Sequence, residues 1–225
     1  NYFYKNNITH GGDGVFIRVL NGWISERNIF VENDTSYANN NCVESWSPGN
    51  TYVRNIAERG SYGFWLGGSD HTVLIGNKAN YSGLASGYHN AGEPGFGNAG
   101  IAIAGFASAN TLIAGNETIG NNGAGIAFRG KVPKTGPSFR MFNWILRQNR
   151  IEDNKIGIWG RFGDWMHQNG NYFVGNVVDS DIAETLNVSV TLPSEAATRA
   201  PYAALLAQQR SASVMKLSLM LRLQW

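Results

Sequence analysis

The stretch Asn50-Thr-Tyr-Val-Arg-Asn55 is followed 22 residues later by Thr72-Val-Leu-Ile-Gly-Asn77, with apolar residues and a final asparagine in matching places. The pattern returns as Thr111-Leu-Ile-Ala-Gly-Asn116, Trp144-Ile-Leu-Arg-Gln-Asn149 and Asn171-Tyr-Phe-Val-Gly-Asn176. The final asparagines of the first four copies are 22, 39 and 33 residues apart. Periods of 20–50 residues are typical of solenoids, propellers and repeat arrays, so the longer spacings indicate insertions into a repeated unit.

A second pattern follows each of the first four copies and combines glycine with alternating apolar residues, as in Ala99-Gly-Ile-Ala-Ile-Ala104. These runs are too short for helices, and the regular leucines of a leucine-rich repeat are absent. We therefore expect an all-β parallel solenoid of about seven coils between Tyr2 and Glu184. Alternate apolar residues fill a tube, and successive coils lie about 4.8 Å apart. The recurring asparagines suit tight turns and are expected to stack as a ladder.

The two patterns together resemble the right-handed parallel β-helix repeat proteins. This superfamily includes pectate-lyase-like and polygalacturonase-like enzymes, alginate epimerases and the periplasmic NosD-type proteins of copper-enzyme maturation. The resemblance covers Tyr2 to about Glu184 and implies the fold, but the repeat records how coils stack rather than what they bind. No catalytic signature of a particular family is matched, so the resemblance assigns no catalytic residue.

Composition excludes several classes of function. The chain has 225 residues and a net charge of +2, without the basic excess of a nucleic-acid-binding protein. Cys42 is the one cysteine, which excludes an internal disulfide, and the four histidines are scattered, which disfavours a copper or zinc cluster. No cofactor is expected; turns rich in Asp and Asn can hold Ca²⁺, but no regular Asp spacing or EF-hand loop supports such a site. No apolar run reaches the length of a membrane span, and we expect a secreted or periplasmic protein whose leader lies outside this chain.

The chain is expected to divide into a β-helix, residues 1–185, and a C-terminal cap or extension, residues 186–225. Leu186 to Leu192 is predicted to form a last strand and Pro201 to Arg210 a short helix. An amphipathic strand is predicted next, because apolar and polar residues alternate at Leu217, Leu219, Leu221, Leu223 and Trp225. A cap over the open end of the solenoid, an oligomer contact and a cloning-derived extension all fit this tail.

Period-2 alternation in the second pattern also predicts an outward face. Two outward columns are expected, one of Phe16, Glu44, Trp65, Ala102, Ala127 and Trp159, and one of Arg18, Trp46, Gly67, Ala104, Arg129 and Arg161. Flat rings beside charged groups suit the apolar faces and polar rims of sugars, and arginine forks suit uronate carboxylates. The central alanines and glycines would leave a trough for a polysaccharide. Alternatively, loops fold over the rings and bury them.

Two insertions adjoin this face, and long loops commonly carry function. Ser82 to Asn98 would bring His89 and Glu93 to the trough, and Gly130 to Met141 would bring Lys131 and Lys134. After the Trp159 strand, Asp164, Trp165 and His167 would add a carboxylate, a ring and an imidazole.

These residue types predict a carbohydrate-active enzyme that cleaves glycosidic bonds. A hydrolase needs two carboxylates about 5–9.5 Å apart, for which Glu44, Glu93 and Asp164 are candidates, and Asp70 is a further carboxylate. A lyase needs a base and a cation, for which Arg129, Arg161, Lys131 and His89 are candidates. The hydrolase is slightly favoured because Glu44 lies in the aromatic column. The expected catalytic residues are therefore Glu44, Glu93, Asp164 and Arg129; the expected sugar-binding residues are Arg18, Trp46, Trp65, His89, Lys131, Trp159 and Arg161. The rival is a non-catalytic sugar-binding or scaffold β-helix of the NosD type, which buried tryptophans without an open cleft would favour.

Overall fold

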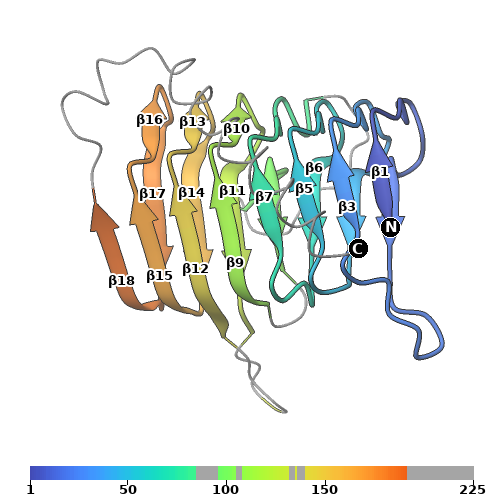
Figure 1. The fold of residues 1–225 in the computed structure, drawn as a ribbon. Helices are drawn as coiled ribbons and strands as arrows, with labels where there is room; N and C mark the ends of the chain where they lie inside the picture. Colours follow the sequence, from blue (N-terminus) through green and yellow to red (C-terminus); the bar gives the residue numbers. More distant parts are fainter. Residues whose placement is uncertain (85–95, 105–107, 132–134, 136–139, 192–225) are drawn as a thin grey trace.

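The computed structural model describes residues 1–84, 96–104, 108–131, 135 and 140–191. These residues form strands that are stacked along one axis, from β1 at one end to β18 at the other (Figure 1). Every strand pairs in parallel with the equivalent strand of a neighbouring coil. The predicted right-handed parallel β-helix is therefore confirmed.

Three sheets make up the tube. The eight-stranded sheet contains β1 (Tyr2–Tyr4), β3 (Ile29–Val31), β5 (Thr51–Val53), β7 (Val73–Ile75), β9 (Ala109–Ala114), β12 (Met141–Arg147), β15 (Gly163–Asn169) and β18 (Leu186–Thr191). The seven-stranded sheet contains β2 (Val15–Ile17), β4 (Asn41–Ser45), β6 (Tyr62–Leu66), β8 (Ile101–Ile103), β11 (Ala124–Arg129), β14 (Ile156–Arg161) and β17 (Val178–Ala183). The three-stranded sheet contains β10 (Glu117–Ile119), β13 (Arg150–Glu152) and β16 (Tyr172–Val174). Single bridges from Asn7 to Glu117 continue this third sheet, so the described chain makes the seven expected coils.

The core lies inside the tube and follows the predicted alternation. Phe64, Ile101, Ile126 and Ile158 occupy equivalent places in successive coils and are fully buried. The register is kept across the insertions, since Leu74 still pairs with Ile113 in the next coil. An inserted loop therefore leaves the tube without displacing the strands that bury the core.

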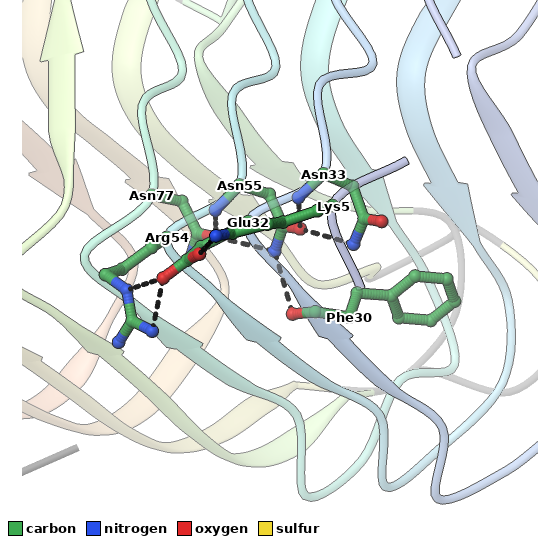
Figure 2. A network of polar contacts seen from close by, with 7 residues as sticks. All are labelled: Lys5, Phe30, Glu32, Asn33, Arg54, Asn55 and Asn77. Atoms are coloured by element: carbon green, nitrogen blue, oxygen red, sulfur yellow. Dashed lines mark hydrogen bonds and ion pairs between the residues drawn. The ribbon is translucent and has the colours of Figure 1, made fainter. Parts of the chain in front are cut away.

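The predicted asparagine ladder is present at the turn after the eight-stranded sheet. Figure 2 shows three of its members, Asn33, Asn55 and Asn77, with the side-chain amide of each coil bonded to the next. Each carbonyl oxygen also accepts the backbone N–H of the previous coil's asparagine, at 3.0 Å for Asn33 and 2.9 Å for Asn55. The ladder runs from Asn6 to Asn171 without a break. The tight turns thus leave few buried amide groups unsatisfied.

A row of charges lies beside this ladder. Glu32 accepts two hydrogen bonds from the Arg54 guanidinium, at 2.6 and 2.8 Å, and faces Lys5 at 3.6 Å (Figure 2). These side chains occupy one left-handed turn position, since the φ angles of Lys5, Glu32 and Arg54 are 52°, 55° and 52°. Stacking of equivalent positions therefore pairs charges across three coils. The Arg54 hydrogen bonds hold the pKa of Glu32 below its ordinary value.

The glycines of the second pattern are required by coil stacking. A Cβ on Gly63 would lie 2.5 Å from the carbonyl oxygen of Gly100 in the next coil. Gly125 and Gly157 occupy the same place in later coils and face the same obstruction. Glycine thus lets the turn into the seven-stranded sheet pack at the spacing of the tube.

The beginning of the predicted C-terminal unit continues the β-helix. The strand expected at Leu186 to Leu192 is observed at Leu186–Thr191, where it pairs in parallel with β15. The expected helix at Pro201 to Arg210, the amphipathic strand ending at Trp225 and the proposed cap lie outside the described residues. Within the described ranges no helix is long and apolar enough to cross a membrane.

Candidate functional site

The outward face of the seven-stranded sheet was the predicted site, and its strand register places the residues in one row. Phe16 pairs with Glu44, Glu44 with Trp65, and Trp65 with Ala102. The row then continues through Ala127, Trp159 and Asp181. The predicted alternation is therefore correct, and the face can be followed from its N-terminal to its C-terminal coil.

The middle of this face is closed by the protein itself. Phe96, at the end of the first insertion, is fully buried and packs with Ala102, Ala127 and Trp159 in a cluster separate from the tube core. Its ring lies 5.5 Å from the Trp159 ring in an edge-to-face arrangement. The small alanine side chains, which were expected to leave an open trough, instead make room for this ring. The expectation of an open trough is therefore wrong.

Trp159 was predicted to present an open ring to sugar, and this too is corrected. It is only 3% exposed, because Phe96 covers one side and Arg161 lies 4.7 Å from its ring centroid. Arg161 also donates hydrogen bonds to the Asp181 carboxylate at 3.0 Å and to the Gly160 carbonyl at 2.8 Å. This tryptophan and arginine act as packing and ion-pair partners.

Arg129 contacts the same cluster through Phe96. Its guanidinium carbon is 5.6 Å from the centroid of the Phe96 ring, within the range of a cation–π contact. Trp65 is partly buried and contacts Phe96 edge-to-face at 5.7 Å and Tyr62 at 4.7 Å. Trp65 and Trp159, which were predicted to bind sugar, and Arg129, which was predicted to be catalytic, are thus brought together around the ring of Phe96.

Glu44, the leading catalytic candidate, is held by two neutral donors. Its carboxylate accepts a hydrogen bond from Asn41 Nδ2 at 2.5 Å and one from the Trp46 indole Nε1 at 2.6 Å. A Cβ on Gly67 would lie 2.5 Å from the Trp46 ring, so the indole lies across that glycine. One role of Glu44 is therefore to orient Trp46 on the sheet surface.

The N-terminal end of the face is more open. Phe16 is 49% exposed, and the exposed Arg18 lies 5.7 Å from its ring centroid. Together with Glu44, Trp46 and Trp65, these residues form what we call the N-terminal patch. Among the residues predicted to form the site, those of this patch keep their rings and charges near solvent.

Asp164 does not join the predicted face. It lies on β15 of the eight-stranded sheet, where its Oδ1 accepts a hydrogen bond from Asn187 Nδ2 at 2.8 Å. Trp165 and His167 lie on the same strand, and His167 Nδ1 is 2.7 Å from Ser189 Oγ. The chain turns into another sheet between Arg161 and Gly163, which sequence alternation alone did not locate. Placing Asp164 beside Glu44 was therefore wrong.

The insertion residues are only partly placed. His89, Glu93 and Lys134 lie outside the described residues, while Lys131 is exposed just after β11. Asp70, a further carboxylate candidate, accepts the Ala109 backbone N–H at 2.6 Å and so supports a turn.

The described carboxylates of this row are too far apart for a glycosidase pair. Glu44 and Asp181 are separated by five strand steps in the register. At about 4.8 Å a step this is about 24 Å, whereas the two catalytic carboxylates need about 5–9.5 Å. The row therefore holds no hydrolytic pair among the residues described.

Metal ligands are likewise dispersed. Within the described ranges no group of three His, Cys, Asp or Glu side chains could hold an ion. His10 stacks on Tyr37 at 4.8 Å and His71 is 3.3 Å from Asn110. Cys42 is buried in the tube, which raises the pKa of its thiol to about 12 and disfavours the thiolate that metals bind.

A comparison with family models identifies the chain. The model described as "Periplasmic copper-binding protein (NosD)" matches residues 4–198. The chain belongs to the NosD family. The match spans all seven coils, so the NosD-type resemblance is confirmed, and a search of curated proteins finds no match. The family description implies copper. The described residues of this NosD-family chain do not fit a copper site, because no three of their His, Cys, Asp or Glu side chains lie together.

The sequence did not lead us to predict that Phe96 covers the outward face of the seven-stranded sheet. The signal was present as a phenylalanine between two glycines, at the end of an insertion that leads into a strand whose outward residues are alanines. Large and small residues at facing positions are the usual sign of packing.

Proposed function

We propose that this NosD-family chain is a non-catalytic β-helix that works in the periplasm as a binding scaffold. The observation that carries the proposal is the closed centre of the predicted active face, where Phe96 fills the space a polysaccharide would need. The family description supports the location. The repeated coils supply a rigid rod whose outer surfaces hold side chains at fixed spacing.

A panel of polysaccharides, including uronate polymers, tests this proposal. Both new reducing ends and unsaturated products should stay at the level of a no-protein blank. Release of either product by the parent protein, lost in the Glu44→Gln variant, would contradict the non-catalytic proposal, since that variant keeps the side chain's size but removes its charge.

A second candidate is oligosaccharide binding without cleavage at the N-terminal patch. It is favoured by the 49% exposure of Phe16 and by Arg18 beside it. Phe16→Ala should weaken oligosaccharide binding by about 1 kcal/mol, or roughly five-fold, in calorimetric titration. Trp23→Ala is the matched control, because Trp23 is 82% exposed and lies outside the seven-stranded sheet. Equal effects of the two substitutions, or no binding by the parent, would remove this candidate.

A further inference from the structure

A column of residues with left-handed backbone geometry runs along the eight-stranded sheet, at or just before the start of its strands. These residues occupy equivalent places in successive coils, and their φ angles lie between 52° and 68°. The members of the column are Arg27, Gly49, His71, Asn110, Asn143, Trp165 and Asn187. Glycine and asparagine adopt this geometry readily, whereas a bulky aromatic residue adopts it with strain. Trp165 is therefore the member whose side chain the backbone favours least.

Trp165 also interrupts a polar ladder on this column. In the coils before it, Asn143 Nδ2 donates a hydrogen bond to Asn110 Oδ1 at 2.7 Å. In the coil after it, Asn187 Nδ2 donates instead to Asp164 Oδ1 at 2.8 Å. An asparagine in place of the tryptophan would suit the left-handed turn and could continue the ladder. The indole thus stands where the local structure favours an amide, and strained residues of this kind cluster at functional sites.

The Trp165 ring lies on the outer side of the sheet and is open to solvent. Met166, the next residue on β15, is 1% exposed and belongs to the tube core, which places Trp165 on the opposite side of the strand. Trp165 is 48% exposed, and within the described ranges its one ring contact is with His167, whose ring centroid is 6.3 Å away. Its strand lies between β12 and β18 (Figure 1). A large apolar ring is therefore presented to solvent on this sheet.

Hydrogen-bonding groups surround this ring. Asp164 and His167 come from its own strand, and Asn143 and Asn187 come from the strands on either side. Two of these groups are held in place, since Asp164 Oδ1 accepts from Asn187 and His167 Nδ1 is 2.7 Å from Ser189 Oγ. Over the part of the chain that is described, no partner is observed for the second carboxylate oxygen, the other imidazole nitrogen or the two amide oxygens. The rim of the ring therefore has hydrogen-bonding capacity left for a ligand.

A flat ring inside a polar rim matches the chemistry of a pyranose. A sugar ring has an apolar C–H face that packs on an indole and hydroxyl groups at its edge that need donors and acceptors. The charge of the site narrows the class of sugar, because Asp164 makes no ion pair among the residues described and its carboxylate would repel a uronate. The site therefore suits a neutral sugar.

We propose that Trp165 binds a neutral oligosaccharide, with one pyranose on the indole and its hydroxyl groups bonded to Asn143, Asp164, His167 and Asn187. We call these five residues the Trp165 site. The inference goes beyond the binding role proposed above, since the N-terminal patch lies on a different sheet and the Trp165 site does not depend on it.

Trp165→Asn in the full chain separates a binding role from a packing role. Calorimetric titration with cellohexaose, chitohexaose and maltohexaose measures binding, and the parent should bind at least one of these probes. The substitution should weaken that binding at least about tenfold, because the ring is lost. The midpoint of thermal unfolding should stay equal or rise, because asparagine relieves the backbone. Trp23→Ala is the matched control, since Trp23 is 82% exposed elsewhere, and it should leave the affinity unchanged.

Four results would overturn the Trp165 site. The first is that the parent binds none of the three probes. The second is a lower unfolding midpoint in Trp165→Asn, because the ring would then serve packing. The third is an equal loss of affinity in Trp23→Ala, which would mean that the sugar binds exposed rings without selection. The fourth is a loss of binding in Phe16→Ala with none in Trp165→Asn, which would place the sugar at the N-terminal patch and leave the binding-scaffold proposal standing.

The neutral character of the ligand has a test of its own. The parent should bind hexagalacturonate at least about tenfold more weakly than the neutral probe it prefers, because the Asp164 carboxylate repels the uronates. Asp164→Asn removes that charge at nearly constant size and should narrow the difference. Tighter binding of hexagalacturonate by the parent, or a difference that Asp164→Asn leaves unchanged, would overturn the assignment of a neutral sugar to this site.

Discussion

Replacing Asn55 by alanine should be among the most damaging changes a single polar side chain in this protein can undergo. Asn55 lies in the middle of the ladder and is 2% exposed (Figure 2). Its carbonyl oxygen accepts from the Asn33 backbone N–H at 3.0 Å and from Asn33 Nδ2 at 2.9 Å. Its amide donates to the Phe30 carbonyl at 3.0 Å and to Asn77 Oδ1 at 3.0 Å. The side chain therefore links three coils.

The expected loss follows from those four bonds. Each buried hydrogen bond contributes about 1 kcal/mol net, and a buried partner left unsatisfied costs about 1–3 kcal/mol. Asn33 Nδ2 keeps a bond to Phe3, and Asn77 Oδ1 keeps the Asn55 backbone donor, which limits the damage. We expect Asn55→Ala to lower the free energy of unfolding by about 3–5 kcal/mol, a large share of the roughly 5–15 kcal/mol of an ordinary domain.

Urea denaturation followed by circular dichroism measures this loss. Asn39→Ala is the matched control, since Asn39 is exposed and its side chain makes no hydrogen bond among those observed in the described ranges. The control should change the free energy by no more than about 0.5 kcal/mol. If Asn55→Ala costs as little as the control, the ladder is a consequence of coil stacking and not a cause of its stability.

Three further predictions concern the core, the aromatic cluster and the charge row. Ile126→Asp places an unpaired charge in the tube at a fully buried position, so soluble expression should be lost, and a soluble cooperative variant would contradict the inward assignment. Trp159→Ala should cost about 3–5 kcal/mol in urea denaturation because it empties a site that Phe96 and Arg161 enclose, whereas a near-neutral result would mean that the ring is open to solvent. Because Arg54 lowers the pKa of Glu32, this pair should contribute about 0.5–1 kcal/mol above the ordinary glutamate pKa. That contribution should disappear as the pH falls through the lowered value, so the stabilities of Glu32→Gln and the parent should converge in acid and differ at pH 7.

The fold could be predicted from the sequence because each coil repeats the same local constraints. Gly63 is required where coils approach too closely for a Cβ, and Asn55 is required where a buried turn needs donors and acceptors on both sides. Such constraints recur at fixed intervals, so they appear as a period even when an insertion separates two coils. The inward positions of Ile101 and Ile126 follow from the same periodicity.

The candidate site could be predicted only in part, because alternation gives the direction of a side chain and not what lies above it. The register placed Glu44, Trp65 and Trp159 in one row, as expected. It carried no information on whether the insertion would return to that row, and Phe96 does so. Asp164 was misplaced for a related reason, since the turn after Arg161 moves the chain to another sheet.

Both outer faces then pose the same physical question, which is how a solenoid with apolar outward columns avoids exposing them. On the seven-stranded sheet the answer is visible: small alanines receive a ring from the insertion, and arginines lie over the rings at its margin. On the eight-stranded sheet Val31 and Val53 are just as buried, yet they carry larger side chains that leave no hollow for a ring. The seven-stranded sheet thus covers its apolar outward columns with a ring from an inserted loop, and the surface still open for partners is expected near Phe16 and Arg18.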